Sequence, residues 1–343
     1  MAIKILVTGG TGYIGSHTVV ELIGKGYEVV IADNLSNSSA DVVDAIQKIT
    51  GIRPVFIKAE FTDAAQTAAI FEAHPDISGV IHFAALKAVG ESVEKPLLYY
   101  HNNLFSLINV MQSMQAIGSN KIVFSSSCTV YGQPEALPVS ESSPILPAMS
   151  PYGNTKQIAE EMIRDNAAVT SLKATLLRYF NPIGAHASAL IGELPLGIPN
   201  NLMPFITQTA MGKRGQLKVF GNDYNTPDGT CIRDYIHVVD LAQAHIVALE
   251  RMLDNKSLQN VEVFNLGTGN GFSVLEVIQA FERNTGLNLN YVFAPRRPGD
   301  IEQIWADTTY ANHTLGWKAS LTLDDMVSSA WKWECRLGSR REE

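Results

Sequence analysis

Short apolar runs alternate with longer amphipathic stretches through the first half of the chain. The apolar runs predict buried strands, and the amphipathic stretches predict helices. The predicted strands cover residues 3–7, 28–32, 55–60, 79–85, 121–127 and 173–180, and the clearest predicted helices cover residues 14–25, 97–118 and 152–170. Strands that alternate with helices form a parallel sheet covered on both faces, so residues 1–180 are predicted to form a doubly wound α/β domain.

The alternation ends after about residue 180. Glycine and proline become frequent over residues 181–204, the apolar runs become short, and helices are predicted at residues 239–254, 273–286 and 323–337. We therefore predict a smaller, mixed α/β domain over residues 181–343, mainly for substrate binding, with some of its chain returning to the first domain. Ligands of open α/β sheets lie beyond the carboxyl ends of the strands, so an active site is expected in the cleft between the domains.

A glycine-rich turn, TGGTGYIG, follows the first predicted strand at residues 8–15. Its spaced glycines allow a tight turn and a close approach to a pyrophosphate, which the following helix N-terminus attracts. The turn therefore predicts a Rossmann-type dinucleotide site. Asp33 ends the next strand and is expected to hold a ribose diol and to repel a 2′-phosphate, which favours NAD over NADP. The other interpretation of Asp33 is a turn residue at a strand end.

Tyr152 and Lys156 stand four residues apart, on one face of a predicted helix. A tyrosine hydroxyl, with a pKa of about 10, is a poor base at neutral pH, and a lysine ammonium one turn along is expected to lower that pKa. The pair indicates a general base for an alcohol proton. Ser127, at the end of a predicted strand, is expected to offer its hydroxyl to the same alcohol. A solvated helix face and a polar strand end are the alternative interpretations.

Composition and charge argue against several classes of partner. The 343 residues carry a net charge of −8 without a basic run, so nucleic acid and anionic membranes are not expected partners. No apolar stretch is long enough to span a bilayer, and the chain opens into a strand rather than a signal peptide. Cys128, Cys231 and Cys335 are scattered without metal-ligand spacing, so we expect no metal site and a reducing compartment, the cytoplasm.

Together, the glycine turn, the serine at the strand end and the Tyr-x-x-x-Lys pair resemble the extended short-chain dehydrogenase/reductase family. Within that family the chain is most similar to the branch of UDP-hexose 4-epimerases. The resemblance extends over almost the whole chain. Matching stretches lie at residues 9–18, 80–93, 122–132, 150–156, 177–185, 197–204, 220–224, 232–240 and 294–300.

The resemblance implies a retained NAD cofactor and a reversible 4-epimerisation of UDP-galactose to UDP-glucose through a transient 4-keto intermediate, in galactose metabolism. Tyr152 would take the proton of the sugar 4-hydroxyl, and Ser127 would bridge the sugar oxygen and the tyrosine. Lys156 would hold the phenolate and the nicotinamide ribose. The keto sugar would then turn about its pyrophosphate link, so UDP must be held firmly and the hexose loosely.

The resemblance also assigns binding roles by position. Cofactor contacts fall on Gly9, Gly12, Tyr13, Ile14, Gly15, Asp33, Asn34, Phe83, Ala84, Lys87, Asn102, Ser125, Tyr152, Lys156 and Tyr179. Substrate contacts fall on Lys87, Ser127, Tyr152, Asn181, Asn200, Asn201, Leu202, Phe220, Arg233, Arg297, Asp300 and Ile304. Arginines suit this role because their fork matches phosphate oxygens. The alternatives are an ion pair of Arg233 with the adjacent Asp234, and a solvated turn at Arg296 and Arg297.

Three positions depart from the family pattern. Glu60 and Phe61 replace an Asp-Ile or Asp-Leu pair near the adenine, and Ala85 replaces a glycine before Leu86. Ile304 stands where family members restricted to UDP-glucose and UDP-galactose carry a tyrosine, and where members that accept N-acetylhexosamines carry a smaller residue. We therefore hypothesise that the sugar pocket has room for an N-acetyl group.

Three other functions stay open at this point. A nucleotide-sugar 4,6-dehydratase shares the fold, NAD, tyrosine and lysine, but it needs an acid and a base for elimination. Related dehydratases carry Thr-Asp-Glu where this chain has Ser127, Cys128 and Thr129. A net nucleotide-sugar oxidoreductase would need a cofactor that exchanges. A dinucleotide-binding sensor without turnover would not need the tyrosine, lysine and serine together.

The quaternary state is indicated by two helices. The predicted helices over residues 97–118 and 152–170 carry apolar residues on more than one face, as a two-fold, helix-packed dimer requires. The family resemblance implies a homodimer of this kind. Burial of both faces within one chain is the alternative explanation of the pattern.

Overall fold

The computed structural model describes residues 2–297 and 300–339. The chain folds into two compact units. The first unit comprises Met1–Gln133, Pro144–Tyr179 and Ala242–Phe264, and the second comprises Pro134–Ser143, Phe180–Leu241 and Asn265–Glu343. The second unit therefore includes a short segment from the first half of the sequence, and the first unit includes a segment from the second half.

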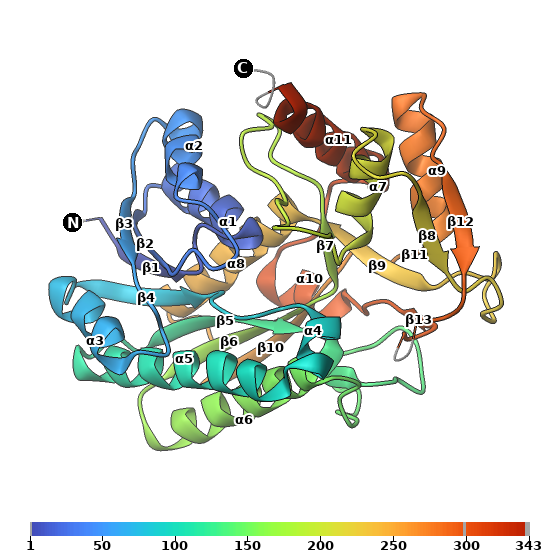
Figure 1. Cartoon of the computed structure of the whole chain (residues 1–343). Helices are drawn as coiled ribbons and strands as arrows, with labels where there is room; N and C mark the ends of the chain where they lie inside the picture. Colours follow the sequence, from blue (N-terminus) through green and yellow to red (C-terminus); the bar gives the residue numbers. More distant parts are fainter. Residues whose placement is uncertain (1, 298–299, 340–343) are drawn as a thin grey trace. The chain divides into compact units, whose positions relative to one another are not determined.

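A seven-stranded sheet forms the centre of the first unit (Figure 1). Its strands are β1 (Lys4–Thr8), β2 (Glu28–Asp33), β3 (Val55–Lys58), β4 (Ile77–His82), β5 (Lys121–Ser127), β6 (Lys173–Tyr179) and β10 (Val261–Leu266). They lie in the order β10-β6-β5-β4-β1-β2-β3, and the pairs from β3 to β6 are parallel. This order has the reversal of direction at β1 that defines a Rossmann-type sheet, so the predicted fold class is confirmed.

Helices cover both faces of this sheet, with α1, α2 and α8 on one side and α3, α5 and α6 on the other (Figure 1). The helices are α1 (Tyr13–Gly24), α2 (Asp41–Thr50), α3 (Ala64–Ala73), α4 (Val89–Glu94), α5 (Pro96–Ala116), α6 (Pro151–Val169) and α8 (Val238–Leu253). Two of them begin with a proline, which fits the first turn because its missing N–H has no partner there. One core is formed by apolar strand residues such as Leu6 and Ile122 and by Leu107 and Ile163 of the helices.

Three predicted strands run past the observed ends: those over residues 55–60 and 173–180 by two residues and one residue, because β3 ends at Lys58 and β6 at Tyr179, and that over residues 79–85 by three. Residues 79–85 were predicted as strand, but β4 ends at His82. Beyond it, Phe83 N–H still donates to Thr8 O at 3.0 Å, whereas Ala84 N–H donates to the Thr8 side-chain hydroxyl at 3.3 Å. The chain leaves the ladder here because the glycine turn after β1 lies against Ala84.

The second unit contains a mixed sheet. The central strand β9 (Ile232–His237) pairs in parallel with β7 (Asn181–Ile183) and β13 (Gln303–Ile304), and antiparallel with β11 (Gly271–Ser273). β8 (Leu217–Phe220) and β12 (Tyr291–Ala294) form a separate parallel pair. The helices are α7 (Leu202–Ala210), α9 (Val274–Thr285), α10 (Thr309–Leu315) and α11 (Leu323–Ser339). Apolar residues of α7, α9 and α11 share a second core with these strands.

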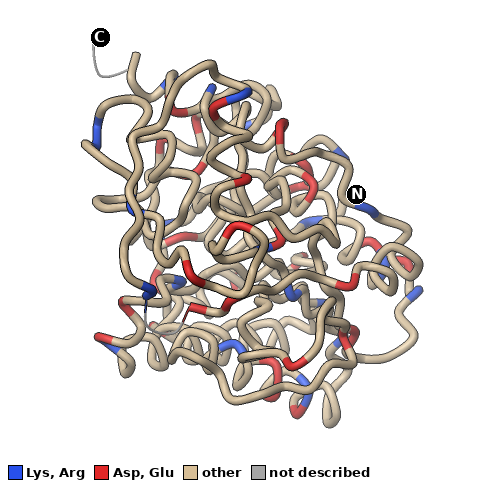
Figure 2. Tube along the Cα trace, turned by 90° about the vertical axis from the view of Figure 1, so that its right-hand side faces the viewer, with Lys and Arg blue, Asp and Glu red and all other residues tan. Residues whose placement is uncertain are grey.

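Charged residues of both signs are interspersed along the chain (Figure 2). Among the residues that the structure describes, no helix is both long and apolar enough to cross a membrane.

Candidate active site

The glycine turn has room for backbone but not for side chains. Gly9 has a φ of +70°, and a Cβ there would lie 2.9 Å from Ala84 N. A Cβ at Gly15 would lie 2.3 Å from Gly9 O. Gly12 is the residue before α1, and no side chain caps that helix end. The turn therefore leaves backbone N–H groups of a helix N-terminus accessible to a phosphate, as a dinucleotide requires.

Asp33 is held beside this turn. Its carboxylate is 5% exposed, and it accepts hydrogen bonds from Thr11 N at 3.2 Å and Leu35 N at 2.9 Å. The neighbouring Asn34 donates to Glu60 Oε2 at 2.9 Å. Burial alone would raise the pKa of Glu60, but hydrogen bonds from Asn34 and Thr62 outweigh burial and lower it. Glu60, which departs from the family pattern, therefore holds the side chain of Asn34 in place through this hydrogen bond.

Phe61, the second residue of that departure, lies in the core of the first unit. Its carbonyl accepts a hydrogen bond from Asn109 Nδ2 at 2.8 Å. Phe61 is therefore a packing residue whose side chain is turned into the core.

Tyr152 and Lys156 lie in the first turns of α6. Ser150 caps this helix by accepting a hydrogen bond from Gly153 N at 3.2 Å. Lys156 is buried, and its Nζ donates to Ser125 O of β5 at 2.6 Å. Ser127, at the end of β5, is hydrogen-bonded to Tyr152. The structure thus brings together the three residues that the sequence singled out for chemistry, from one strand and one helix.

Burial shifts the pKa values of these two groups in opposite directions. It raises the pKa of Tyr152 to about 12, against the lowering effect of the Ser127 hydrogen bond. It lowers the pKa of Lys156 to about 8, against the raising effect of Glu160. The predicted lowering of the Tyr152 pKa is wrong for the chain by itself, because Lys156 Nζ lies 5.8 Å from the Tyr152 ring centroid and donates to Ser125 instead.

Other predicted cofactor residues line the same end of the sheet. Tyr179 is hydrogen-bonded to the Ser125 hydroxyl, and burial raises its pKa. The Phe83 ring lies 4.7 Å from the His245 ring. Lys87 Nζ lies 5.9 Å from the ring centroid of Tyr13, the first residue of α1.

Asn103 was missed by the sequence interpretation. Asn102, which was predicted to contact the cofactor, donates to Asn103 Oδ1 at 3.0 Å. The buried Asn103 amide also accepts from Leu86 N at 2.8 Å and donates to Thr155 Oγ1 at 3.1 Å. It therefore ties the loop after β4 to α6. The only signal in the sequence was a polar residue in an apolar helix, which is too common to assign a role.

The predicted substrate residues lie on the second unit, apart from Lys87, Ser127 and Tyr152. Arg297 makes a bidentate pair with Asp300, at 3.0 and 3.1 Å, and its guanidinium lies 5.0 Å from the Phe220 ring centroid. Arg233 Nη1 donates to Ile232 O at 2.9 Å. Ile304 is buried on β13 and pairs with Arg233 in the sheet.

Asp234 does not take Arg233 as its partner. Its carboxylate accepts from the backbone N–H groups of Thr268, Gly269 and Ala306, at 2.8, 3.0 and 3.2 Å. Burial raises the pKa of this carboxyl, against these hydrogen bonds. The alternative interpretation of Arg233 as half of an ion pair with Asp234 is therefore wrong.

The amide side chains are less constrained. Asn181 opens β7, and Asn201 Nδ2 donates to Glu193 Oε1 at 2.5 Å. Asn200 is exposed, and Leu202 begins α7 and packs against the second core.

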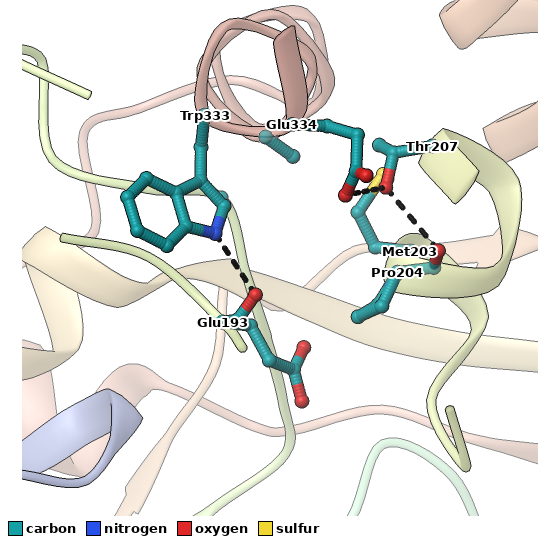
Figure 3. Close-up of a pocket in the computed structure, with 8 residues that line it drawn as sticks. Glu193, Met203, Pro204, Thr207, Trp333 and Glu334 are labelled. Carbon is teal, nitrogen blue, oxygen red and sulfur yellow. Dashed lines mark hydrogen bonds between the residues drawn. The ribbon is translucent and has the colours of Figure 1, made fainter. Parts of the chain in front are cut away.

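Two hollows in the described part of the second unit bear on the candidate site. A groove of about 460 Å³ runs past Gly221, Asp223, Phe293 and Arg296, next in sequence to Phe220 and Arg297. The other hollow is a cavity of about 10 Å³ between α7 and α11 (Figure 3). That volume holds about one water molecule, whereas ligand pockets begin at about 300 Å³, so this cavity is not a nucleotide site.

Comparisons with known proteins give a dehydratase family model and UDP-glucose 4-epimerases. The family model described as GDP-mannose 4,6 dehydratase matches residues 6–330. The UDP-glucose 4-epimerase of Bacillus subtilis (strain 168) is 53% identical over 331 residues, 96% of this chain and 96% of that protein. The structure of a UDP-glucose-4-epimerase from Stenotrophomonas maltophila, with bound NAD and formylated UDP-arabinopyranose, has a TM-score of 0.94 and 50% identity and covers 99% of both chains. The structure of the UDP-Glc/GlcNAc 4-epimerase of Campylobacter jejuni has a TM-score of 0.83 and 36% identity and covers 98% of this chain and 100% of that one.

Proposed function

The chain belongs to the family of UDP-glucose 4-epimerases, as its motifs predicted, and from this premise we propose that it interconverts UDP-galactose and UDP-glucose. It is then an NAD-dependent isomerase that acts through a transient 4-keto sugar. The observation that carries this proposal is the contact of Tyr152 with Ser127 beside the buried Lys156. A hydroxyl network of this kind removes a proton from a secondary alcohol.

The first unit fits NAD. The glycine turn and the uncapped start of α1 would hold the pyrophosphate, and Asp33 with Asn34 would hold the adenosine ribose. Lys156 and Tyr179 would hold the nicotinamide end, with Phe83, Ala84, Lys87, Asn102 and Ser125 around them. When bound, NAD supplies the acceptor and donor of hydride that epimerisation requires.

Three side chains handle the sugar proton. Tyr152 accepts the proton of the sugar 4-hydroxyl and returns it to the opposite epimer. Its phenolate is costly at this buried position, as its raised pKa shows. Lys156 keeps its proton at pH values below about 8, so it supplies a positive charge on the same helix face. Ser127 donates a hydrogen bond that holds the phenol oxygen near the sugar oxygen.

The second unit holds the nucleotide. Arg233 and Arg297 bind the pyrophosphate oxygens, because their planar forks match phosphate geometry. Phe220 offers an aromatic face to the base, and Asp300 orients Arg297 through the bidentate pair. The amides of Asn181, Asn200 and Asn201, with the side chain of Leu202, complete the UDP contacts. Firm binding of UDP leaves the hexose free to turn between its two orientations.

The substrate range extends to N-acetylhexosamines. Ile304 is smaller than the tyrosine of restricted family members, and it lies next to Arg233 in the sheet. The Campylobacter jejuni relative is named for both UDP-Glc and GlcNAc. One or two methylenes in a pocket change discrimination by about 1–3 kcal/mol, so acceptance of UDP-N-acetylglucosamine would be partial rather than complete.

A dehydratase is the less favoured function, despite the description of the matching family model. Elimination of water needs an acid and a base next to the tyrosine. Here Ser127 is followed by Cys128 and Thr129 in a 3-10 turn, and neither is a carboxylate.

A homodimer is the proposed assembly. Apolar side chains are exposed along α4 and the start of α5, with Leu97 81% exposed and Val93 and Phe105 also largely open to solvent. Exposed apolar side chains on two successive helices favour a protein–protein interface. Sedimentation of the purified chain as a monomer at micromolar concentration would remove this proposal.

We assign the protein to the cytoplasm. Cys128, Cys231 and Cys335 form no disulfide in the part of the chain that the structure describes, and unbridged thiols persist in a reducing compartment.

Conversion of UDP-sugars without added NAD tests the proposed function. The purified protein is incubated separately with UDP-galactose and UDP-N-acetylglucosamine, and the 4-epimers are followed by NMR. Conversion of both is expected. Conversion of UDP-galactose alone keeps the epimerase and removes the extended range. If neither is converted, even after NAD is added, the proposed function is wrong.

A further inference from the structure

The end of β5 and α6 share one more contact besides those of the candidate catalytic residues. Ser126, between Ser125 and Ser127, donates its hydroxyl to Glu160 Oε1 at 2.6 Å. Glu160 follows Lys156 by four residues, as Lys156 follows Tyr152, so all three lie on one face of the helix. The strand end therefore meets the helix at three successive positions, and two of them carry candidate catalytic groups.

Glu160 is buried in a bidentate ion pair. It is 2% exposed, and it accepts from Arg178 Nε at 2.8 Å and from Arg178 Nη2 at 2.5 Å. Arg164, which is partly exposed on the same helix, donates to Glu160 Oε2 at 3.0 Å. Arg178 belongs to β6, the strand beside β5. The pair therefore fixes α6 against two neighbouring strands at once.

Arg178 also reaches the turn after Ser127. Its Nη1 donates to Tyr131 Oη at 3.0 Å, and the guanidinium carbon lies 4.9 Å from the Tyr131 ring centroid. Tyr131 is the last residue of the 3-10 turn Cys128–Tyr131, and Ser127 caps that turn by accepting from Thr129 N at 3.2 Å. Ser127 is thus held by Tyr152 of the helix on one side. On the other side it is held by the 3-10 turn, which the network of Glu160, Arg178 and Tyr131 fixes in place.

The network also balances charge. Lys156 and Arg178 are buried cations, 4% and 2% exposed, and the buried Glu160 carboxylate pairs with Arg178 and attracts the Lys156 ammonium. Without Glu160, the two buried positive charges of Lys156 and Arg178 would lose this counter-charge, which is strongly unfavourable. The pKa of Lys156 would then fall, because loss of its proton removes one of the uncompensated positive charges.

We propose that Glu160, held by Ser126 and Arg178, is a positioning residue for epimerisation: it sets the register of α6 on β5 and keeps Lys156 protonated. The inference rests on the proposed function, because it assigns Lys156 and Tyr152 their roles there. Glu160 itself touches none of the predicted substrate or cofactor groups through a described hydrogen bond, so it acts through its neighbours.

Glu160→Gln tests this inference against a matched ion pair. The control is Glu262→Gln, since Glu262 makes a bidentate pair with Arg251 at 2.8 and 3.0 Å in the same unit and has no described contact with the candidate site. Both variants are assayed where circular dichroism shows them folded. Because a small displacement of catalytic groups costs about 100-fold in rate, kcat of Glu160→Gln should fall by that order with little change in KM. Equal effects in the two variants, or none in either, would overturn the proposal.

The titration of Lys156 gives a readout that does not need turnover. Lys156 faces Tyr152 and Glu160 on α6, His82 on β4, and the Phe124 ring and Ser125 carbonyl of β5, with Arg178 behind Glu160. The ε-carbon of Lys156, labelled with 13C and assigned with Lys156→Arg, is followed by NMR in the protein with its retained cofactor. The midpoint should move to lower pH in Glu160→Gln and stay in place in Glu262→Gln. An unmoved midpoint in Glu160→Gln contradicts the charge-balancing role.

Ser126→Ala keeps the test decisive if Glu160→Gln does not fold. It removes the hydroxyl contact and leaves the ion pair with Arg178 intact. Loss of one hydrogen bond should lower kcat by about 10-fold without lowering the melting temperature as much as Glu262→Gln does. Full activity in Ser126→Ala counts against the positioning role. If the unaltered protein converts no UDP-sugar, the proposed function fails by itself, while the Lys156 titration still decides the inference.

Discussion

The candidate catalytic residues of the first unit and the candidate phosphate-binding arginine Arg297 of the second differ in exposure. In the first unit, Ser127 and Lys156 are buried, and each is fixed by hydrogen bonds to neighbouring elements. In the second unit, Arg297 is 53% exposed, paired with Asp300 on the surface and stacked on Phe220. Ser127 and Lys156 therefore have little conformational freedom, whereas Arg297 can exchange Asp300 for another anion.

This difference follows from what each group has to do. Proton transfer needs shifted pKa values and atoms at fixed positions, and burial supplies both for Tyr152 and Lys156. Phosphate binding needs accessible charge and a planar fork, which an exposed arginine already has. A site can therefore combine a rigid chemical part with a binding part that adapts to its ligand.

Removal of the Tyr152 hydroxyl should have the largest effect. Tyr152→Phe keeps the ring and removes the proton acceptor, so kcat for UDP-galactose should fall by about 1,000-fold. The NAD content of the purified variant should be unchanged, because the glycine turn and Asp33 are intact. Turnover is measured by the NMR conversion assay, and NAD is measured after its release by denaturation. Turnover above one-tenth of that of the unaltered protein would contradict the assignment of Tyr152 as the proton acceptor.

The binding part is tested at Arg297. Arg297→Ala should raise KM for UDP-galactose far more than it lowers kcat, because the lost contacts are made before and during the reaction alike. A charge-assisted contact contributes about 1.5–3 kcal/mol, so kcat/KM should fall by about 30-fold.

Two further variants serve as controls for this test. Arg297→Lys, which keeps the charge without the fork, should lie between the alanine variant and the unaltered protein. Arg296→Ala removes the neighbouring arginine, which pairs with Asp223, and should change kcat/KM little. An equal loss in Arg296→Ala would show a general charge effect rather than a specific contact.

The remaining prediction concerns stability in acid rather than activity. Burial lowers the pKa of His82 to about 3 in the first unit, and burial lowers that of His237 to about 4 in the second. In the unfolded chain a histidine titrates at about 6.5, so the unfolded state binds the proton first as pH falls. Each histidine therefore contributes stability that is complete above pH 6.5 and is lost toward pH 3 for His82 and toward pH 4 for His237, by about 1.4 kcal/mol per pH unit.

Replacement of each histidine separates the two contributions. In His82→Asn and in His237→Asn, the free energy of unfolding should fall less steeply between pH 6 and pH 4 than in the unaltered protein. In His82→Asn the slope should also be smaller between pH 4 and pH 3. All four tryptophans belong to the second unit, so tryptophan fluorescence follows that unit while circular dichroism follows the whole chain. Denaturation curves whose pH dependence matches that of the unaltered protein would show that neither histidine is buried as described.

Much of the first unit could be predicted because its signals are local. The apolar runs placed six of the seven strands of the central sheet, and the glycine turn placed the start of α1. The second unit was harder, since its strands are two to six residues long and pair with distant segments. Neither the short pairing of Ile304 with Arg233 nor the backbone shell around Asp234 has a local pattern.

The sequence by itself determined that this chain forms a Rossmann-type sheet, that a glycine turn precedes its first helix, and that Tyr152 and Lys156 share a helical face. These features depend on residues that lie close together in the sequence, within a single helix or a strand and the turn that follows it. The tertiary structure alone decided that Ser126 and Arg178 meet Glu160, that Asn103 joins a loop to α6, and that burial raises the pKa of Tyr152. Such contacts join segments far apart in the chain, and a pKa depends on the whole surroundings of a group, so both appear only when the chain is folded.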